Sequence, residues 1–359
     1  MDFNDIARSR LANQRIVSTD FKTAENVVSW MGAMQAQDYS GALWAIALRT
    51  PSLTLKDVEA AIEKGKIIRT WPMRGTLHFV AARDARWIVQ LLGPRASAKA
   101  ATRRKGLGIT EKTIEESKTI LSRLLANKTY RSRPDILASF ESAGITTGGQ
   151  RGIHILHYLA EEAYICFGPY IDKQPSFVLF DDWAPSTPDV SKDDALAMLA
   201  IRYFQSHGPA TERDFTAWSG LTLTDVRRGI ELAGSSLTTF EIDRTRYWLD
   251  VTQPTSYTAD TTFLLPGFDE YMLGYRDRRA ALAIEHSDRI VPGGNGVFLP
   301  TIVMDGQVVG TWKKTVRRQT VELLVTPFIP LTDVQQAAVR SAALRYQEFL
   351  QMPVQVTFS

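Results

Sequence analysis

Cysteine is nearly absent from this chain, which carries a single one, Cys166, among its 359 residues. One thiol cannot form an internal disulfide, so the sequence fits a reducing, cytoplasmic compartment. Histidine is also scarce, with five residues scattered along the chain. This composition offers no ligand cluster for structural zinc, and we expect neither a metal nor another cofactor.

Long apolar segments are lacking too. No apolar run approaches the roughly 20 residues that a membrane helix needs, and the N-terminal MDFNDIARSR lacks the basic-then-apolar order of a signal peptide. We therefore expect no membrane partner. The sequence has no P-loop, dinucleotide-binding glycine fingerprint, HExxH or GxSxG motif. The Gly-rich VPGGNGVF (291–298) is expected to be a loop rather than a phosphate cradle, because no strand-to-helix context surrounds it.

The net charge is only +3, but the basic residues are unevenly distributed. Between Arg69 and Lys105 there are nine lysines and arginines and one acid, Asp84. A local basic excess on a nearly neutral chain is typical of a polyanion partner. The alternative is an ordinary solvated surface. A second basic patch, TWKKTVRR (311–318), could continue a surface that follows phosphates.

Helix and strand signals recur in one order along the chain. Three helices followed by a two-stranded ribbon, such as IIRTWPMRGTLHFVA, is the order of a winged helix. We therefore expect an α+β fold with three tandem winged-helix (helix-turn-helix) domains and a β-rich C-terminal subdomain. The expected boundaries are 1–115, 116–180, 190–257 and 258–359.

The C-terminal part shows strand signals and one final helix. Asp305-Gly306, between alternating apolar residues, predicts a β-hairpin turn. The helix DVQQAAVRSAALRYQEFLQ is expected to present one apolar stripe to the core. Its members are Val334, Ala338, Ala342, Leu344 and Phe349.

Two glutamines, Gln35 and Gln37, interrupt the otherwise apolar stretch SWMGAMQAQDYSGALWAIALR. A helix directs residues two apart about 200° away from each other. Both amides can therefore serve one site only at a helix end or on irregular backbone, and DYSG supplies such a break. Asp38 or Ser40 could then cap a helix that runs through Leu48. The alternative is a pair of solvated glutamines on an amphipathic helix.

Two further segments carry polar side chains that could contact a ligand. In RTWPMRGTLHFV, Arg74 could bind phosphate and Trp71 could stack on a base. Core packing in a β-hairpin is the alternative for Trp71 and His78, and it is the favoured interpretation of Trp71. In FDEYMLGYRDRR, the only clustered carboxylates expected to lie in a cleft are Asp269, Glu270 and Asp277.

Four segments in this order resemble the bacterial winged-helix DNA glycosylases typified by AlkZ: MQAQDYSGALWAIALR, RTWPMRGTLHFV, LLPGFDEYMLGYRDR and VFLPTIVMDGQVVGTWKK. The resemblance covers nearly the whole chain. It implies tandem winged helices in a C-shaped arrangement around DNA. It also implies catalysis by a Gln-x-Gln motif, which Gln35-Ala36-Gln37 matches.

The resemblance further implies removal of N7-alkylated purines and, in some members, the unhooking of interstrand crosslinks. We expect a monomer that binds double-stranded DNA, gripped in part by the Asp305–Gly306 hairpin. The residues expected to contact DNA are Arg69, Arg74, His78, Arg276, Trp312, Lys313 and Lys314. The alternatives are a winged-helix regulator without catalysis and a protein-interaction scaffold.

Overall fold

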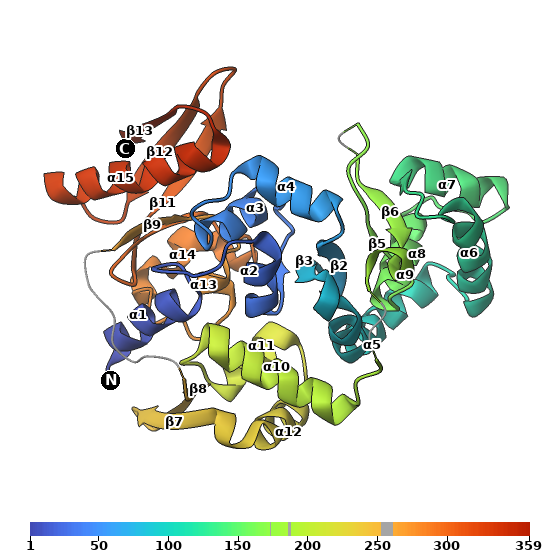
Figure 1. The fold of residues 1–359 in the computed structure, drawn as a ribbon, viewed down its shortest axis with the longest axis horizontal. Coiled ribbons are helices and arrows are strands. Elements are labelled where there is room, and N and C mark those ends of the chain that lie inside the picture. The colour runs from blue at the N-terminus through green and yellow to red at the C-terminus, as the bar shows by residue number, and fades with distance from the viewer. Residues whose placement is uncertain (173, 186–187, 253–260) are drawn as a thin grey trace.

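The structure, a computed structural model, describes residues 1–172, 174–185, 188–252 and 261–359. Helices and strands both contribute widely, so the predicted α+β class is confirmed (Figure 1). No helix within these ranges is long and apolar enough to cross a membrane.

The first part of the chain forms helices around a β-hairpin. Its elements are α1 (Phe3–Asn13), α2 (Ala24–Met31), β1 (Met34–Gln35), α3 (Tyr39–Leu48), α4 (Leu55–Glu63), β2 (Ile67–Met73), β3 (Thr76–Ala81) and α5 (Ala82–Gly106). Local sequence explains several boundaries. The Asp38 carboxylate caps α3 by accepting from the Gly41 N–H at 3.2 Å, and Thr54 and Asp57 form a capping box on α4.

The middle of the chain contains two further groups of helices and strands. The first comprises α6 (Glu111–Leu124), β4 (Arg131–Ser132), α7 (Arg133–Ser142), α8 (Arg151–Glu161), β5 (Ile165–Phe167), β6 (Ser176–Leu179) and α9 (Phe180–Trp183). The second comprises α10 (Lys192–His207), α11 (Glu212–Ser219), α12 (Leu223–Ala233), β7 (Leu237–Ile242) and β8 (Thr245–Asp250). This second group has three helices followed by a hairpin, the order predicted for a winged helix.

The last part is rich in strands, as predicted. It contains β9 (Thr262–Leu265), α13 (Glu270–Leu273), α14 (Ser287–Ile290), β10 (Thr301–Met304), β11 (Gln307–Val316), β12 (Val321–Pro327), α15 (Asp333–Leu350) and β13 (Val354–Phe358). Five of these strands form a sheet in the order β13-β12-β11-β10-β9. Only the β12–β13 pair is parallel, because α15 returns the chain in the same direction.

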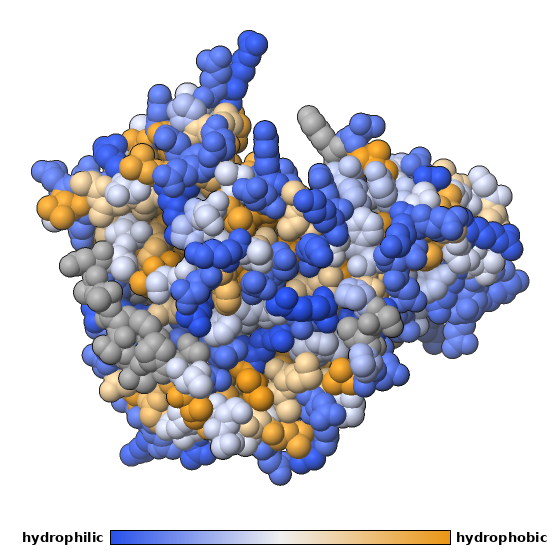
Figure 2. All heavy atoms as spheres, in the orientation of Figure 1, coloured by the Kyte–Doolittle hydropathy of each residue, from blue (hydrophilic) through white to orange (hydrophobic). Residues whose placement is uncertain are grey.

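Packing crosses the boundaries predicted from sequence. A six-stranded sheet, β1-β3-β2-β5-β6-β4, joins strands on both sides of residue 115. One buried cluster contains Val28 and Trp44 of the first part together with Leu323 and Tyr346 of the last part. The number of winged-helix domains and their limits therefore stay predictions. Hydrophilic side chains dominate the face shown in Figure 2, since most apolar residues lie in three buried clusters.

Candidate active site

The Gln-x-Gln motif lies between two helices, with Gln35 at the end of the short strand β1 and Gln37 in the bend that follows. Helix α2 ends at Met31, and Gly32 turns the chain with φ of 76°. The chain then forms β1, where Gln35 pairs with His78 of β3. The motif thus avoids the regular helix that would have separated Gln35 from Gln37.

Three contacts hold the backbone of the motif. The Gln35 N–H donates to Glu270 Oε1 at 2.9 Å, and the Ala36 N–H donates to the Leu77 carbonyl at 2.8 Å. On the other side of the same dipeptide, Arg69 Nη2 donates to the Ala36 carbonyl at 2.8 Å. Glu270 and Arg69 are both buried. The motif is therefore fixed between a buried carboxylate and a buried guanidinium.

The two amide side chains differ in exposure. Gln37 is exposed, and its Oε1 accepts from the Leu77 N–H at 3.3 Å. A carbonyl oxygen has two lone pairs, so this atom can also accept from water. Gln35 is half-buried, and its Oε1 is enclosed without a partner among the described residues. An unpaired buried acceptor costs about 1–3 kcal/mol, which a bound water or substrate would relieve.

Arg74 and His78 lie beside Gln35. Arg74 occupies the β2–β3 turn with φ of 58°, a conformation that arginine seldom adopts. Its Nη2 lies 3.1 Å from His78 Nε2 and its Nη1 donates to the Ala217 carbonyl at 3.3 Å. Burial, followed by the charge of Arg74, lowers the pKa of His78 to about 3. A neutral His78 that accepts at Nε2 carries its proton on Nδ1, 2.9 Å from the Thr76 carbonyl.

Glu270 is the functional residue that the sequence only partly revealed. Its Oε2 accepts from Trp218 Nε1 at 2.9 Å and lies 3.6 Å from His207 Nε2. Burial opposes ionisation of Glu270, but contact with His207, the Gln35 N–H and the charge of Arg74 together lower its pKa to about 2. Burial also lowers the pKa of His207. We therefore assign a carboxylate to Glu270 and a neutral ring to His207.

The other two clustered acids have structural contacts. Asp269 forms a paired interaction with Arg49, with both hydrogen bonds at 2.9 Å and both side chains fully buried. Asp277 binds Arg279 at 2.6 Å. Of the three carboxylates noted in the sequence, only Glu270 contacts the motif.

Two tyrosines border the motif. Tyr39 and Tyr170 have ring centroids 5.0 Å apart, and Tyr170 is 41% exposed. Arg69 Nη1 donates to the Tyr170 hydroxyl at 3.0 Å while Nη2 holds Ala36. Arg69 was expected to contact DNA. Its buried guanidinium instead bridges the Ala36 carbonyl of the motif and the exposed Tyr170. Trp71 is buried against Phe167, so the core alternative holds for it.

A family model, DNA glycosylase AlkZ-like, matches residues 28–349, which is most of the chain. The chain belongs to the AlkZ-like DNA glycosylase family. It is thus a DNA glycosylase, a hydrolase that acts on N-glycosyl bonds. An interstrand DNA cross-link repair glycosylase of Streptomyces sahachiroi is 26% identical over 380 residues, covering 97% of each chain. The solved DNA glycosylase AlkZ of that organism has the same fold, with a TM-score of 0.82, 24% identity and coverage of 99% and 100%.

Three features expected to contact DNA in this AlkZ-like enzyme are enclosed instead. His78 is fully buried, and Trp312 is 4% exposed with its indole N–H bound to the Leu265 carbonyl at 2.8 Å. The Asp305–Gly306 turn forms as predicted, but Gly306 packs against Ala7 of α1. Gly306 is buried and Asp305 half-buried, and the expected grip of this hairpin on DNA stays a prediction. Alternating apolar residues predict a hairpin, but they do not show whether its turn faces solvent or packs against another part of the protein.

The remaining candidates of the AlkZ-like enzyme keep accessible side chains. Arg276 and Lys313 are exposed. Lys314 is half-buried on the opposite side of β11 from Lys313, and its Nζ donates to Ser40 Oγ at 2.9 Å. Burial lowers the pKa of Lys314. Strand alternation therefore places only one of the two lysines beside the motif.

Proposed function

We propose that this enzyme hydrolyses the N-glycosidic bond of cationic N7-alkylated purines in duplex DNA, using a water positioned by Gln37 and Gln35. The observation that carries this proposal is the non-helical Gln35-Ala36-Gln37 segment, whose backbone is held by Glu270 and Arg69 and which has one exposed amide and one unpaired amide oxygen. The same segment matches the Gln-x-Gln signature of the family.

The chemistry suits neutral amides. Alkylation at N7 makes the purine cationic and therefore a good leaving group. When the bond between C1′ and N9 breaks, the electron pair goes to N9 and neutralises the base, leaving positive charge on the sugar. A water oxygen then bonds to C1′ and releases a proton to solvent. Catalysis thus depends on placing this water, which is a positioning task.

An open site also supports action on crosslinks. Gln37 is exposed, so a bulky adduct that cannot be fully extruded from the duplex could still reach it. The Streptomyces sahachiroi relative is named for interstrand crosslink repair. We propose that this enzyme unhooks such crosslinks, that it acts as a monomer, and that its helix groups bind DNA as tandem winged helices in a C-shaped arrangement. Its place of action would be the cytoplasm, on the nucleoid.

The deciding experiment compares wild type with Gln37→Ala on methylated and on mustard-treated duplex. Wild type should produce abasic sites that alkali converts to strand breaks, and the variant should lose at least tenfold in rate while keeping its DNA affinity. A regulator without catalysis would produce no abasic sites in either form. Equal rates for wild type and Gln37→Ala would remove the assigned role of the amide.

Substrate charge provides a second test. An amide stabilises the sugar cation less than a carboxylate would, so departure of the base depends on its own positive charge. Release of 7-methylguanine should therefore be faster than release of hypoxanthine or uracil from otherwise identical duplexes. Faster release of the neutral bases would contradict the proposed mechanism.

A further inference from the structure

A second cleft lies away from the Gln-x-Gln motif, between the β7–β8 turn, the start of α11 and the segment 276–298. Its volume is about 1040 Å³. The cleft is lined by six arginines: Arg213, Arg244, Arg246, Arg276, Arg278 and Arg279. The Gly-rich loop 291–298 forms part of its wall. Gly294 and Gly296 have φ of 64° and 76°, and a Cβ at either would meet no atom within 4 Å.

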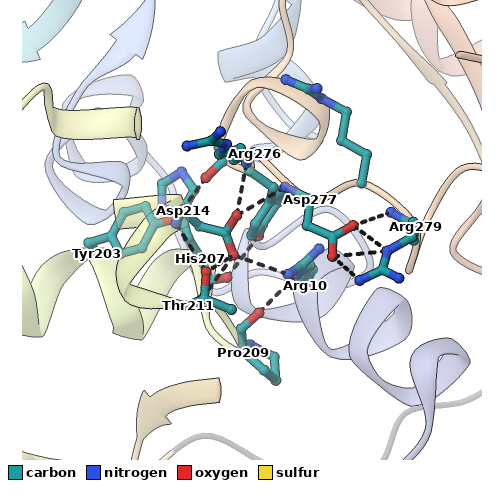
Figure 3. Close-up of polar contacts among 12 residues, drawn as sticks. Arg10, Tyr203, His207, Pro209, Thr211, Asp214, Arg276, Asp277 and Arg279 are labelled. Carbon is teal, nitrogen blue, oxygen red and sulfur yellow. Dashed lines mark hydrogen bonds and ion pairs between the residues drawn. The ribbon is translucent and has the colours of Figure 1, made fainter. Parts of the chain in front are cut away.

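The acids that also line the cleft are largely occupied. The buried Asp214 accepts from the backbone N–H groups of Arg276 at 2.8 Å and Asp277 at 3.2 Å (Figure 3). Its other oxygen accepts from the Thr211 N–H and hydroxyl, both at 2.9 Å, and lies 3.9 Å from Arg10. Figure 3 shows the Asp277 carboxylate turned toward the Arg279 guanidinium.

Two acids of the lining remain. Glu212 binds Arg227 at 2.9 Å. Asp288 has no ion-pair partner among the described residues and is the one lining carboxylate left to oppose an anion. The negative charge in the cleft is therefore mostly compensated before a ligand binds.

Three arginines remain available. Arg246 pairs with Glu241 and Arg279 pairs with Asp277, while Arg278 packs over a phenylalanine ring. The exposed guanidinium groups of Arg213, Arg244 and Arg276 have no hydrogen-bond or ion-pair partner in the described ranges. A guanidinium presents a fork of donors that matches a phosphate.

The cleft is connected to the active site along α11. Arg213 and Arg276 also line a smaller hollow together with Ala217. The carbonyl of Ala217 accepts from Arg74, which contacts His78 beside the motif. Arg213 lies four residues before Ala217 on α11, about 6 Å along the helix at 1.5 Å per residue. The Arg74 side chain continues this path to His78, so the cleft lies more than two base-pair steps of roughly 3.4 Å from the motif.

We propose that this arginine cleft binds the phosphate backbone of the duplex arm next to the lesion, several base pairs from the reacting sugar. The inference rests on the proposed function, since it assumes that the lesion lies at the Gln-x-Gln motif. Arg213, Arg244 and Arg276 contact phosphates of that arm, and the glycines of the 291–298 loop let the backbone approach. The contact is independent of sequence and requires a duplex long enough to reach the cleft.

The test uses the full chain with Arg213→Gln/Arg244→Gln, which leaves the active site untouched. Fluorescence anisotropy measures binding to undamaged duplexes of about 8 and about 30 base pairs over a range of KCl concentrations. On the long duplex the variant should bind on the order of tenfold more weakly. The magnitude of the slope of log K against log[KCl] should decrease by about 2, because each of the two lost phosphate contacts contributes roughly 0.9 to it. On the short duplex both proteins should bind alike.

A control removes an exposed arginine outside the helix groups proposed to bind DNA, Arg340→Gln on α15, and should not change the slope in this way. An unchanged slope for the cleft variant, an equal loss on both duplexes, or an equal loss in the control would each overturn the proposal. Binding to undamaged DNA does not depend on catalysis. A wild type that binds long duplex but releases no base would instead refute the proposed function alone.

Discussion

At the scale of single residues, the active site depends on side chains that never reach the solvent. Glu270 and Arg69 contact the peptide groups on either side of the Gln35-Ala36 pair, through the Gln35 N–H and the Ala36 carbonyl. A carboxylate and a guanidinium make stronger hydrogen bonds than neutral groups, and both are buried. They restrict the backbone that carries the two amides. Glu270 is therefore a positioning residue rather than one that touches DNA.

Glu270→Gln tests this role. A carboxamide has one acceptor oxygen, so it cannot accept from both Gln35 N–H and Trp218 Nε1 as the carboxylate does. We expect the single-turnover rate to fall on the order of 10²-fold, the scale of a misplaced reacting group. DNA affinity should stay close to that of wild type. The control Glu115→Gln changes an exposed acid of α6 and should leave the rate unchanged. Parallel losses of affinity and melting temperature would indicate a merely structural role.

Tyr170 offers a second test at this scale. Its ring is partly exposed beside the motif and its hydroxyl is held by Arg69. If the ring stacks on a base, Tyr170→Ala should weaken binding of lesion-containing duplex by about 1–3 kcal/mol. Tyr170→Phe keeps the ring and should bind like wild type. Equal binding by wild type and Tyr170→Ala would exclude stacking at this position.

At the scale of elements, the sheet and the hairpins decide which polar side chains meet. The segment 311–316 contains two adjacent lysines, and strand β11 directs them to opposite sides. Lys314 contacts Ser40, next to the Gln-x-Gln motif, while Lys313 is exposed on the other side. The two residues were expected to act together on DNA, and the structure separates them.

The two lysines should therefore respond differently to substitution. Lys314→Ala removes a cation adjacent to the motif, so we expect weaker DNA binding and a salt slope smaller by about 1. Lys313→Ala serves as the matched control and should change binding little. Similar losses for both substitutions would mean that DNA contacts both sides of β11. No change for either would exclude this strand from the DNA interface.

Helix α15 shows where a one-dimensional pattern was wrong. Val334 is 80% exposed and Leu344 is 56% exposed, although both were assigned to the buried stripe. The helix buries Val339, Ala343 and Tyr346 together with Phe349 of the expected stripe, and Ala342 of that stripe is half-buried against the same cluster. The spacing of the buried residues, four and then three, fits a helical face. Because α15 carries apolar residues on two faces, packing against the sheet determines which of the two faces is buried.

At the scale of the whole molecule, burial of neutral histidines predicts sensitivity to acid. Burial lowers the pKa of His78 to about 3 and that of His157 to about 4, below the ordinary value of 6.5. As the pH falls through 6.5, the unfolded chain takes up protons that the folded protein resists. The free energy of unfolding should then decrease by up to about 1.4 kcal/mol per pH unit for each such histidine. Glu270, with a pKa of about 2, adds a loss below pH 4.5.

Urea unfolding at pH 7.5 and 5.5 measures this effect. Wild type should be less stable at the lower pH, and His157→Gln should reduce the difference between the two values. Burial raises the pKa of Glu161, beside His157, to about 7, so protonation of this carboxyl opposes the loss. A difference between the two pH values that His157→Gln leaves undiminished would therefore contradict a neutral His157. The ionisation states of His78 and Glu270 should stay constant above pH 6.5. The glycosylase rate should therefore vary little from there to pH 9.

The amino-acid sequence by itself determined the elements whose signals are local. The cap at Asp38 and the hairpin at Asp305-Gly306 both occur where the sequence predicts them. These features depend on contacts within a few residues along the chain. The Gln-x-Gln motif is also a local feature, because three consecutive residues of the sequence are enough to identify it.

Only the tertiary structure decided what surrounds the motif. Glu270 reaches Gln35 across 235 positions of sequence, and β1 is a strand solely because β3 pairs with it. His78 and Trp312 became core residues because the sheets that carry them are covered by helices. Contacts between distant segments depend on how whole elements pack, and no local pattern in this chain encodes that packing.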